Sequence, residues 1–112
     1  MPMFLPKEPG RKELLLTAVL YALSDEVRLE IVRQLAERGE QACGVFEVDR
    51  PKSSLSHHFR VLRESGVVST RKDGKTLLNT LRREDLDARF PGLLGAVLED
   101  GKNAKKRRAP VS

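Results

Sequence analysis

The sequence predicts a mainly α-helical domain that carries one two-stranded β-hairpin. Apolar residues recur at helical spacing in residues 11–38 and again in 53–65, whereas residues 67–81 alternate with a period of two. The alternating stretch is interrupted by Asp73-Gly74, a dipeptide that is typical of hairpin turns. A chain of 112 residues, of which 39% are hydrophobic and 33% charged, has the size and composition of one small soluble domain.

Two helices are expected at the start of this domain. Residues 11–23 form the first, whose apolar stripe consists of Leu15, Leu16, Val19, Leu20 and Leu23. Residues 25–38 form the second. Ser24 is a suitable N-cap for it, because a serine hydroxyl can accept a hydrogen bond from a free backbone N–H of the first turn. Gly39 is a suitable end.

A short helix over residues 44–48 and a longer one over 53–65 follow, and Gly66 can close the longer helix in a left-handed conformation. Successive helical residues point about 100° apart, so one side of the longer helix faces the core through Leu55, Phe59 and Leu62. The opposite side carries Ser53, His57, Arg60 and Glu64.

The two adjacent histidines of the longer helix raise the possibility of a metal site. His57 and His58 point in different directions, whereas chelation of one ion from a single helix needs a spacing of four residues. The pair is therefore not expected to bind metal. His58 lies at the edge of the buried face and His57 points outward.

The chain then forms the hairpin over residues 68–81 and a last helix over 83–100, which Pro91 can break. The resulting order, α-α-α-α-β-β-α, is the layout of a winged helix-turn-helix DNA-binding domain. Residues 1–10 are expected to be a flexible leader, 11–100 the DNA-binding and dimerisation domain, and 101–112 a basic disordered tail without periodicity.

Positive charge is concentrated in the middle of the chain. Residues 50–83 contain nine basic and two acidic residues, whereas residues 1–49 contain six and nine, and residues 84–101 contain one and five. A merely solvated surface would scatter the two signs, so the concentration favours an anionic partner such as nucleic acid.

Two stretches resemble the ArsR/SmtB family of bacterial repressors. "LSDEVRLEIVRQLAERGE" resembles the second helix of that family, and "SSLSHHFRVLRESGVVSTRKDGKTLLNTL" resembles its recognition helix and wing. The match extends from about Leu20 to Leu98. It implies a homodimeric regulator in which the serines and the histidine region contact the operator, while the position of His58 serves packing and hydrogen bonding.

The expected DNA contacts fall into three groups. Small hydroxyl side chains and longer donors near the start of a recognition helix can reach base edges, here Ser53, Ser54, Ser56 and His57. Cations beside them can reach phosphates, here Lys52, Arg60 and Arg63. The hairpin can touch the backbone or the minor groove through Arg71, Lys72 and Lys75. A charged hairpin tip could instead protect an edge strand from aggregation.

A homodimer is expected because the first and last helices carry more apolar surface than a thin domain can bury. The residues concerned are Leu14, Leu15, Leu16, Val19, Leu93, Leu94, Val97 and Leu98. In the resembled family these two helices form the dimer contact. Two recognition helices about 34 Å apart would then bind an inverted repeat in double-stranded DNA.

No cofactor is predicted, and a metal-ion effector stays open although both usual metal sites of the family are missing. Cys43 is the only cysteine, and the last helix contains no histidine. Cys43 is either a redox switch or a small buried side chain. Its solitary presence suits a reducing compartment, and the apolar runs are too short to span a bilayer, so a cytoplasmic protein without a membrane partner is expected.

The sequence also weighs against an enzyme, since it shows no nucleophile beside a base and no glycine-rich phosphate loop. A winged helix that binds RNA or a protein is the stronger alternative. With one tyrosine and four phenylalanines, the chain offers few aromatic rings for stacking on single-stranded bases. An unknown inducer or a protein co-regulator stays open.

Overall fold

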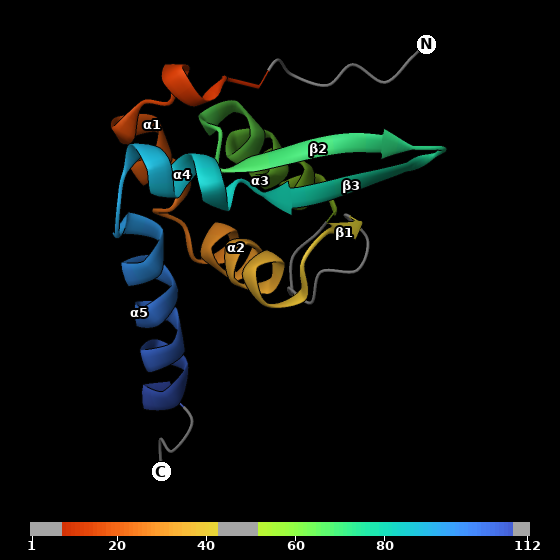
Figure 1. Cartoon of the computed structure of the whole chain (residues 1–112). Coiled ribbons are helices and arrows are strands. Elements are labelled where there is room, and N and C mark those ends of the chain that lie inside the picture. Colours follow the sequence, from red (N-terminus) through yellow and green to blue (C-terminus); the bar gives the residue numbers. More distant parts are fainter. Residues whose placement is uncertain (1–7, 43–51, 109–112) are drawn as a thin grey trace.

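The computed structural model describes residues 8–42 and 52–108, with side chains described over 8–42 and 54–100. Its helices gather around the base of a small antiparallel sheet, and the β-hairpin of that sheet projects away from them (Figure 1). The predicted fold class is confirmed. The elements are η1 (Arg11–Glu13), α1 (Leu16–Ala22), α2 (Glu26–Arg38), β1 (Gln41–Ala42), α3 (Lys52–Ser65), β2 (Val68–Asp73), β3 (Thr76–Leu81), α4 (Arg83–Arg89) and α5 (Leu93–Arg108).

The first predicted helix is interrupted, so its expected extent, residues 11–23, is wrong. Only Arg11–Glu13 and Leu16–Ala22 are helical, and Leu14 and Leu15 between them are extended. The guanidinium of Arg89 donates to the carbonyl oxygens of Arg11 and Leu14, both at 2.9 Å. A continuous helix would need these two carbonyls for its own backbone hydrogen bonds, so a contact from α4 overrides the local helical pattern.

The leader was expected to be flexible as far as residue 10, but residues 8–10 are held by contacts to other elements. The Glu8 carboxylate accepts hydrogen bonds from the Ser69 hydroxyl at 2.8 Å and from the Thr70 backbone N–H at 2.9 Å. The carbonyl of Pro9 accepts one from Arg82 at 2.6 Å. Residues 1–7 of the leader lie outside the described part of the chain.

The second helix begins one residue later than predicted. Asp25, not Ser24, is its N-cap, and the Asp25 carboxylate accepts hydrogen bonds from the backbone N–H groups of Val27 at 2.8 Å and Arg28 at 3.1 Å. The Ser24 hydroxyl instead donates to the carbonyl of Tyr21 at 2.6 Å, which closes α1. Gly39 ends α2, as predicted.

The hairpin over residues 68–81 is confirmed, although its turn lies one residue further on. Asp73 pairs with Thr76 as the last rung of the ladder, so Gly74 and Lys75 are the central turn residues. Gly74 has φ +64, and no described non-glycine residue has a positive φ. A positive φ at the first central position alone is the pattern of a type II′ turn, which favours glycine there.

The wing contains a third strand that the sequence did not predict. The strand β1 pairs antiparallel with β3, which gives the order β1-β3-β2. Two residues are too few to show a periodic pattern, and a buried side chain helps to hold them: the Asn79 amide donates to the carbonyl of Gln41 at 3.3 Å. The short helix expected over residues 44–48 lies outside the described residues.

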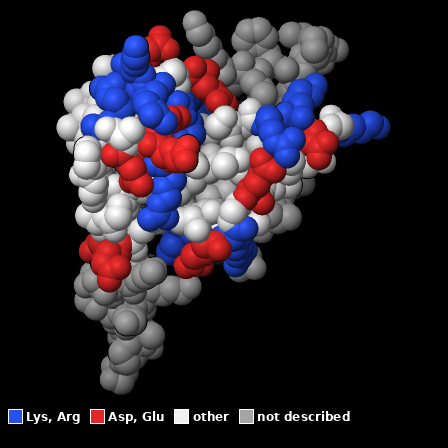
Figure 2. Space-filling model, in the orientation of Figure 1, with Lys and Arg blue, Asp and Glu red and all other residues white. Residues whose placement is uncertain are grey.

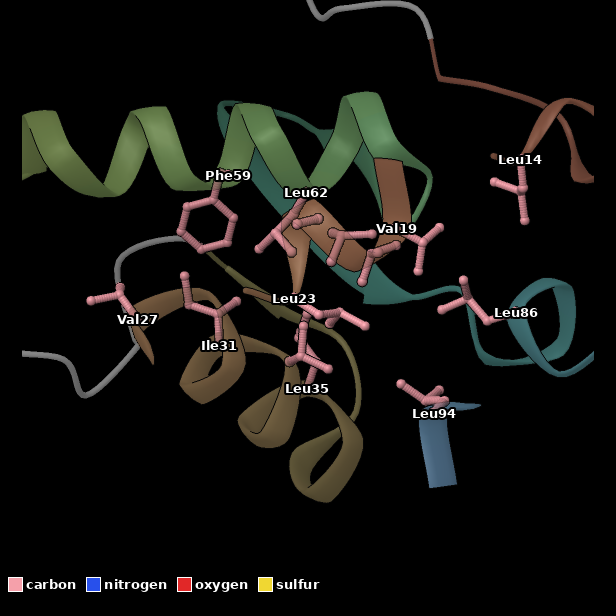
Figure 3. Packing of buried hydrophobic residues seen from close by; sticks show 14 residues of the cluster. Leu14, Val19, Leu23, Val27, Ile31, Leu35, Phe59, Leu62, Leu86 and Leu94 are labelled. Atoms are coloured by element: carbon pink, nitrogen blue, oxygen red, sulfur yellow. The ribbon is translucent and has the colours of Figure 1, made fainter. Parts of the chain in front are cut away.

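The core lies between α1, α2, α3 and the start of the hairpin (Figure 3). Phe59 and Leu62 of α3 point toward Ile31 and Leu35 of α2, and all four are at most 3% exposed. Full burial of such a side chain contributes roughly 1.5–3 kcal/mol, so these contacts fix which face of α3 turns inward.

Gly66 ends α3 with φ +87, as predicted for a left-handed cap. It also faces a tight contact, because a Cβ atom at this position would lie 2.2 Å from Cδ2 of Leu14. Gly66 is therefore required for two independent reasons, its backbone conformation and the close approach of Leu14.

The last predicted helix is broken at Pro91, which separates α4 from α5. The disordered tail predicted from residue 101 is not what the structure shows, because α5 continues to Arg108. Its last two turns are rich in lysine and arginine, which have high helix propensity, and cations are favoured at the negative end of a helix dipole. Residues 109–112 lie outside the described chain.

Candidate nucleic-acid interface

The helix α3 separates its core face from its outer face as the sequence predicts. Phe59 and Leu62 are buried, and Leu55 is partly buried against the core. Ser56, His57 and Arg60 are exposed, and Ser54 is half-buried. Lys52 and Ser53 belong to the first turn of α3, and their side chains lie outside the described set.

Arg63 differs from the other expected phosphate contacts. It lies one turn beyond Arg60 on α3, but its side chain is half-buried, whereas Arg60 is exposed. Arg60 is thus the described cation of α3 that is most accessible to a duplex. The sequence pattern placed both arginines outside the Leu55–Leu62 stripe and could not distinguish their exposure.

Basic side chains lie along the hairpin toward its free end, with acidic side chains between them (Figure 2). Lys72 and Lys75 are exposed there. Arg71 is exposed too, but it is engaged by a neighbouring acid: its Nε and Nη2 donate to the two carboxylate oxygens of Glu40 at 3.0 and 2.8 Å. The Thr80 hydroxyl donates to the same carboxylate at 3.0 Å. The hydrogen bond from Arg71, followed by that from Thr80, lowers the pKa of Glu40.

A buried arginine joins α3 to the two helices before it, and sequence analysis did not find it. Arg28 of α2 is only 5% exposed. Its Nη1 lies 3.0 Å from Nδ1 of His58, and its Nε and Nη2 donate to the carbonyls of Ala22 at 2.8 Å and Tyr21 at 3.2 Å. Helical periodicity marks Leu29 and Ile31 as inward residues, but it cannot show that a neighbouring cation is buried as well.

Asp25 lies at the same junction. Its Oδ1 is 3.9 Å from Nδ1 of His58, while it caps α2. Burial by itself would raise the pKa of Asp25, but the hydrogen bond from the backbone N–H of Arg28, together with the charge that His58 carries when it is protonated, outweighs that effect, so the pKa is lowered overall. The expected position of His58, at the edge of the buried face, is confirmed.

The residues expected at a dimer contact divide into three groups. Leu14, Val19 and Leu94 are at most 1% exposed within the single chain, so their assignment to an interface is wrong, because they fill the chain's own core. Leu93, Val97 and Leu98 are partly buried against that core. Leu15 and Leu16 are exposed, at 65% and 46%. Two further α1 residues join them, Leu20 at 45% and Tyr21 at 60% exposure.

The structure says less about a metal site and about Cys43, the redox candidate. Among the described residues, no group of three or more His, Cys, Asp and Glu side chains could hold a metal ion. Cys43 lies outside the described residues, so its predicted alternatives stay open. Across the described helices, none is long and apolar enough to cross a membrane.

Comparisons with known proteins agree with this geometry. Residues 23–71 match a helix-turn-helix domain family. The chain is 39% identical over 79 residues to the uncharacterised HTH-type transcriptional regulator YceK of Bacillus subtilis, covering 68% of this chain and 79% of that protein. It is 37% identical to an arsenical resistance operon repressor of Staphylococcus xylosus, covering 64% and 70%. Several other curated relatives are matched over about half of their length.

A solved structure supports the same assignment. The transcriptional repressor BigR from Xylella fastidiosa superposes with a TM-score of 0.60 and 34% identity, covering 75% of this chain and 83% of that one. The chain belongs to the ArsR/SmtB family of winged helix-turn-helix transcriptional regulators.

Proposed function

We propose that this protein is a cytoplasmic, homodimeric transcriptional repressor that binds an inverted-repeat operator in double-stranded DNA. The observation that carries the proposal is the division of α3. Phe59 and Leu62 anchor one face in the core, while Ser56, His57 and Arg60 are exposed on the remaining surface. A helix held in this way can present its outer side chains to a major groove without losing its packing.

The outer residues have different roles in this proposal. Ser53, Ser54, Ser56 and His57 read base edges, because hydroxyl and imidazole groups can donate to or accept from them. Lys52, Arg60 and, less directly, the half-buried Arg63 contact phosphates, which supplies affinity without sequence information. Lys72 and Lys75 extend this attraction to the wing, and Arg71 takes part only after it exchanges Glu40 for a phosphate.

The exposed apolar side chains of α1 support the homodimer. Leu15, Leu16, Leu20 and Tyr21 are all 45% or more exposed on one seven-residue helix and the residue before it. Four neighbouring large apolar groups favour association, since their burial against a second copy removes them from water. Two copies related by a twofold axis would place their α3 helices in successive major grooves, about 34 Å apart.

A binding selection tests this function. The full chain is incubated with a pool of random duplexes, bound fragments are recovered over several rounds, and affinity is then compared for a selected duplex and a random one. We expect the selected fragments to share an inverted repeat and to be bound at least about 10³-fold more tightly than random duplex. Failure to enrich any sequence, or tighter binding of the same sequence as RNA, contradicts the proposal.

A further inference from the structure

We propose that Arg28 is a positioning residue for DNA reading, which orients the recognition helix by donating a hydrogen bond to a neutral His58. The inference rests on the proposed function, because it concerns how α3 is presented to the duplex. Arg28 itself is buried and does not face the outer surface of α3.

The guanidinium of Arg28 connects three helices. Two of its nitrogens donate to the carbonyls of Tyr21 and Ala22 at the end of α1, and a third lies 3.0 Å from His58 of α3. The guanidinium carbon also lies 5.2 Å from the centre of the Tyr21 ring. Arg28 belongs to α2, so a change in its hydrogen bonds alters how α3 sits on both preceding helices.

This contact specifies the protonation state of the histidine. A guanidinium has only donors and keeps its charge, so the nitrogen that receives its N–H must offer a lone pair. Nδ1 of His58 is that acceptor, which places the single ring proton of the neutral imidazole on Nε2. A second proton on Nδ1 would point a donor at a donor and bring two positive charges to within 3.0 Å.

Charged and titratable groups surround the contact between Arg28 and His58. On α2, Arg28 opposes its protonation, whereas the carboxylate of Asp25, 3.9 Å from Nδ1, favours it. On α3, the His57 ring centre lies 5.6 Å away. On α1, Tyr21 stacks against Arg28. Protonation would therefore move the ring from Arg28 toward Asp25, which already binds the first turn of α2.

The displacement would reach the base-reading residues directly, because His57 precedes His58 in the same helical turn. A shift of about 1 Å is enough to spoil directional hydrogen bonds to base edges, whereas attraction to phosphates tolerates it. We therefore expect acidification to reduce the preference for the selected duplex over random duplex. The preference is the ratio of the two affinities, so the general gain in positive charge at low pH, which strengthens binding to both duplexes, does not change it.

Two substitutions of His58 separate the acceptor from the titration. His58→Asn can place its amide oxygen where Nδ1 lies, but it does not gain a proton in this range, and His58→Phe has no acceptor. Between about pH 8 and about pH 5.5, where histidines change charge, the native chain should lose preference by about tenfold. His58→Asn should keep its preference at both values, and His58→Phe should show the lower preference throughout.

Each alternative result has a distinct meaning. An equal pH-dependent loss in His58→Asn would assign the effect to His57 and overturn the inference. A native preference that does not change with pH would also overturn it, while the proposed function would stand. A native chain without any preference at about pH 8 would contradict the proposed function, and the inference would fall with it.

Arg28 has a matched control on its own helix. Arg28→Lys keeps the charge but cannot reach three acceptors in a planar fork, so it should reduce the preference by about tenfold while helical content is retained. Arg33→Lys alters another little-exposed arginine of α2, whose partners Glu30 and Glu37 lie on the same helix, and should leave the preference unchanged. Equal preference in the two variants would overturn the positioning role. Thermal unfolding of each variant shows whether a loss of duplex preference reflects unfolding. The comparison of His58→Asn with His58→Phe tests the inference even if Arg28→Lys unfolds.

Discussion

The carboxylate of Glu40 holds the guanidinium of Arg71 in a two-pronged contact, with hydrogen bonds of 2.8 and 3.0 Å on the exposed face of the wing. Glu40 precedes β1 and Arg71 lies on β2, so the pair spans the three-stranded sheet. It links the strand that the sequence did not predict with a residue that was expected to contact DNA. Arg71 can offer this two-pronged face to a phosphate only after it releases the acid.

Glu40→Gln is expected to strengthen binding to every duplex. The amide removes the negative charge that competes with phosphate for Arg71, and it also removes one repulsion near the DNA. When affinity is measured at several salt concentrations, the slope of log affinity against log salt should be steeper by about one for Glu40→Gln than for the native chain. An unchanged slope together with unchanged affinity would show that Arg71 does not meet the DNA backbone.

Gly66→Ala is expected to destabilise the fold more than Gly92→Ala. Both glycines have a positive φ, which costs an alanine about 1–2 kcal/mol. A Cβ at Gly92 meets no atom within 4 Å, whereas at Gly66 it would overlap Leu14, and relieving such an overlap costs about 1–3 kcal/mol more. Urea unfolding of the two variants measures the difference. Equal losses would mean that Leu14 moves aside freely.

Asp85 is expected to make stability depend on pH in the acidic range. The hydrogen bond from Arg11 is the largest cause that lowers the pKa of Asp85 below its ordinary value of 3.8, with a further contribution from Arg82. A carboxyl whose pKa is lower in the folded state stabilises the fold above the unfolded-state value, and this contribution is lost as the pH falls through the folded-state value.

Urea unfolding between about pH 6 and about pH 2.5 tests this expectation. Asp85→Asn should cost about 0.5–1.5 kcal/mol at neutral pH, a value reduced by the partial exposure of Arg11, and its free energy of unfolding should fall less on acidification than that of the native chain. Parallel curves for the two chains would contradict a stabilising role for this carboxylate.

Leu16→Glu is expected to convert the protein to a monomer. The change places a charge among Leu15, Leu20 and Tyr21, which would have to be desolvated on association. Thr17→Glu is the matched control, since Thr17 is exposed on the same turn of α1 but is not one of the exposed large apolar residues. Sedimentation should show monomers for the first variant and dimers for the second. Dimers in both would place the contact elsewhere.

Local patterns were sufficient to predict the elements with strong periodicity. The hairpin over residues 68–81, the two faces of α3 and the cap at Gly66 follow from side-chain spacing and from glycine chemistry, and all are present. The break of the first helix was not predictable in this way. It depends on Arg89, which is 75 residues from Leu14 in the sequence and donates to its carbonyl.

Contacts between distant residues also account for the parts of the site that were missed. The burial of Arg28 depends on carbonyls of α1 and on a histidine 30 residues later, and neither is visible in the period of α2. The surplus of apolar residues correctly indicated exposed leucines on α1. It could not show which ones, because the burial of Leu14 and Val19 depends on tertiary packing and not on local spacing.

The most direct test of base reading by α3 compares His57→Ala with Lys75→Ala on the selected and the random duplex. His57→Ala should weaken binding to the selected duplex by about 1–3 kcal/mol and leave the random duplex almost unchanged, because a base contact is lost. Lys75→Ala should weaken both duplexes equally and reduce the salt slope by about one. Equal losses on both duplexes for His57→Ala would contradict the account.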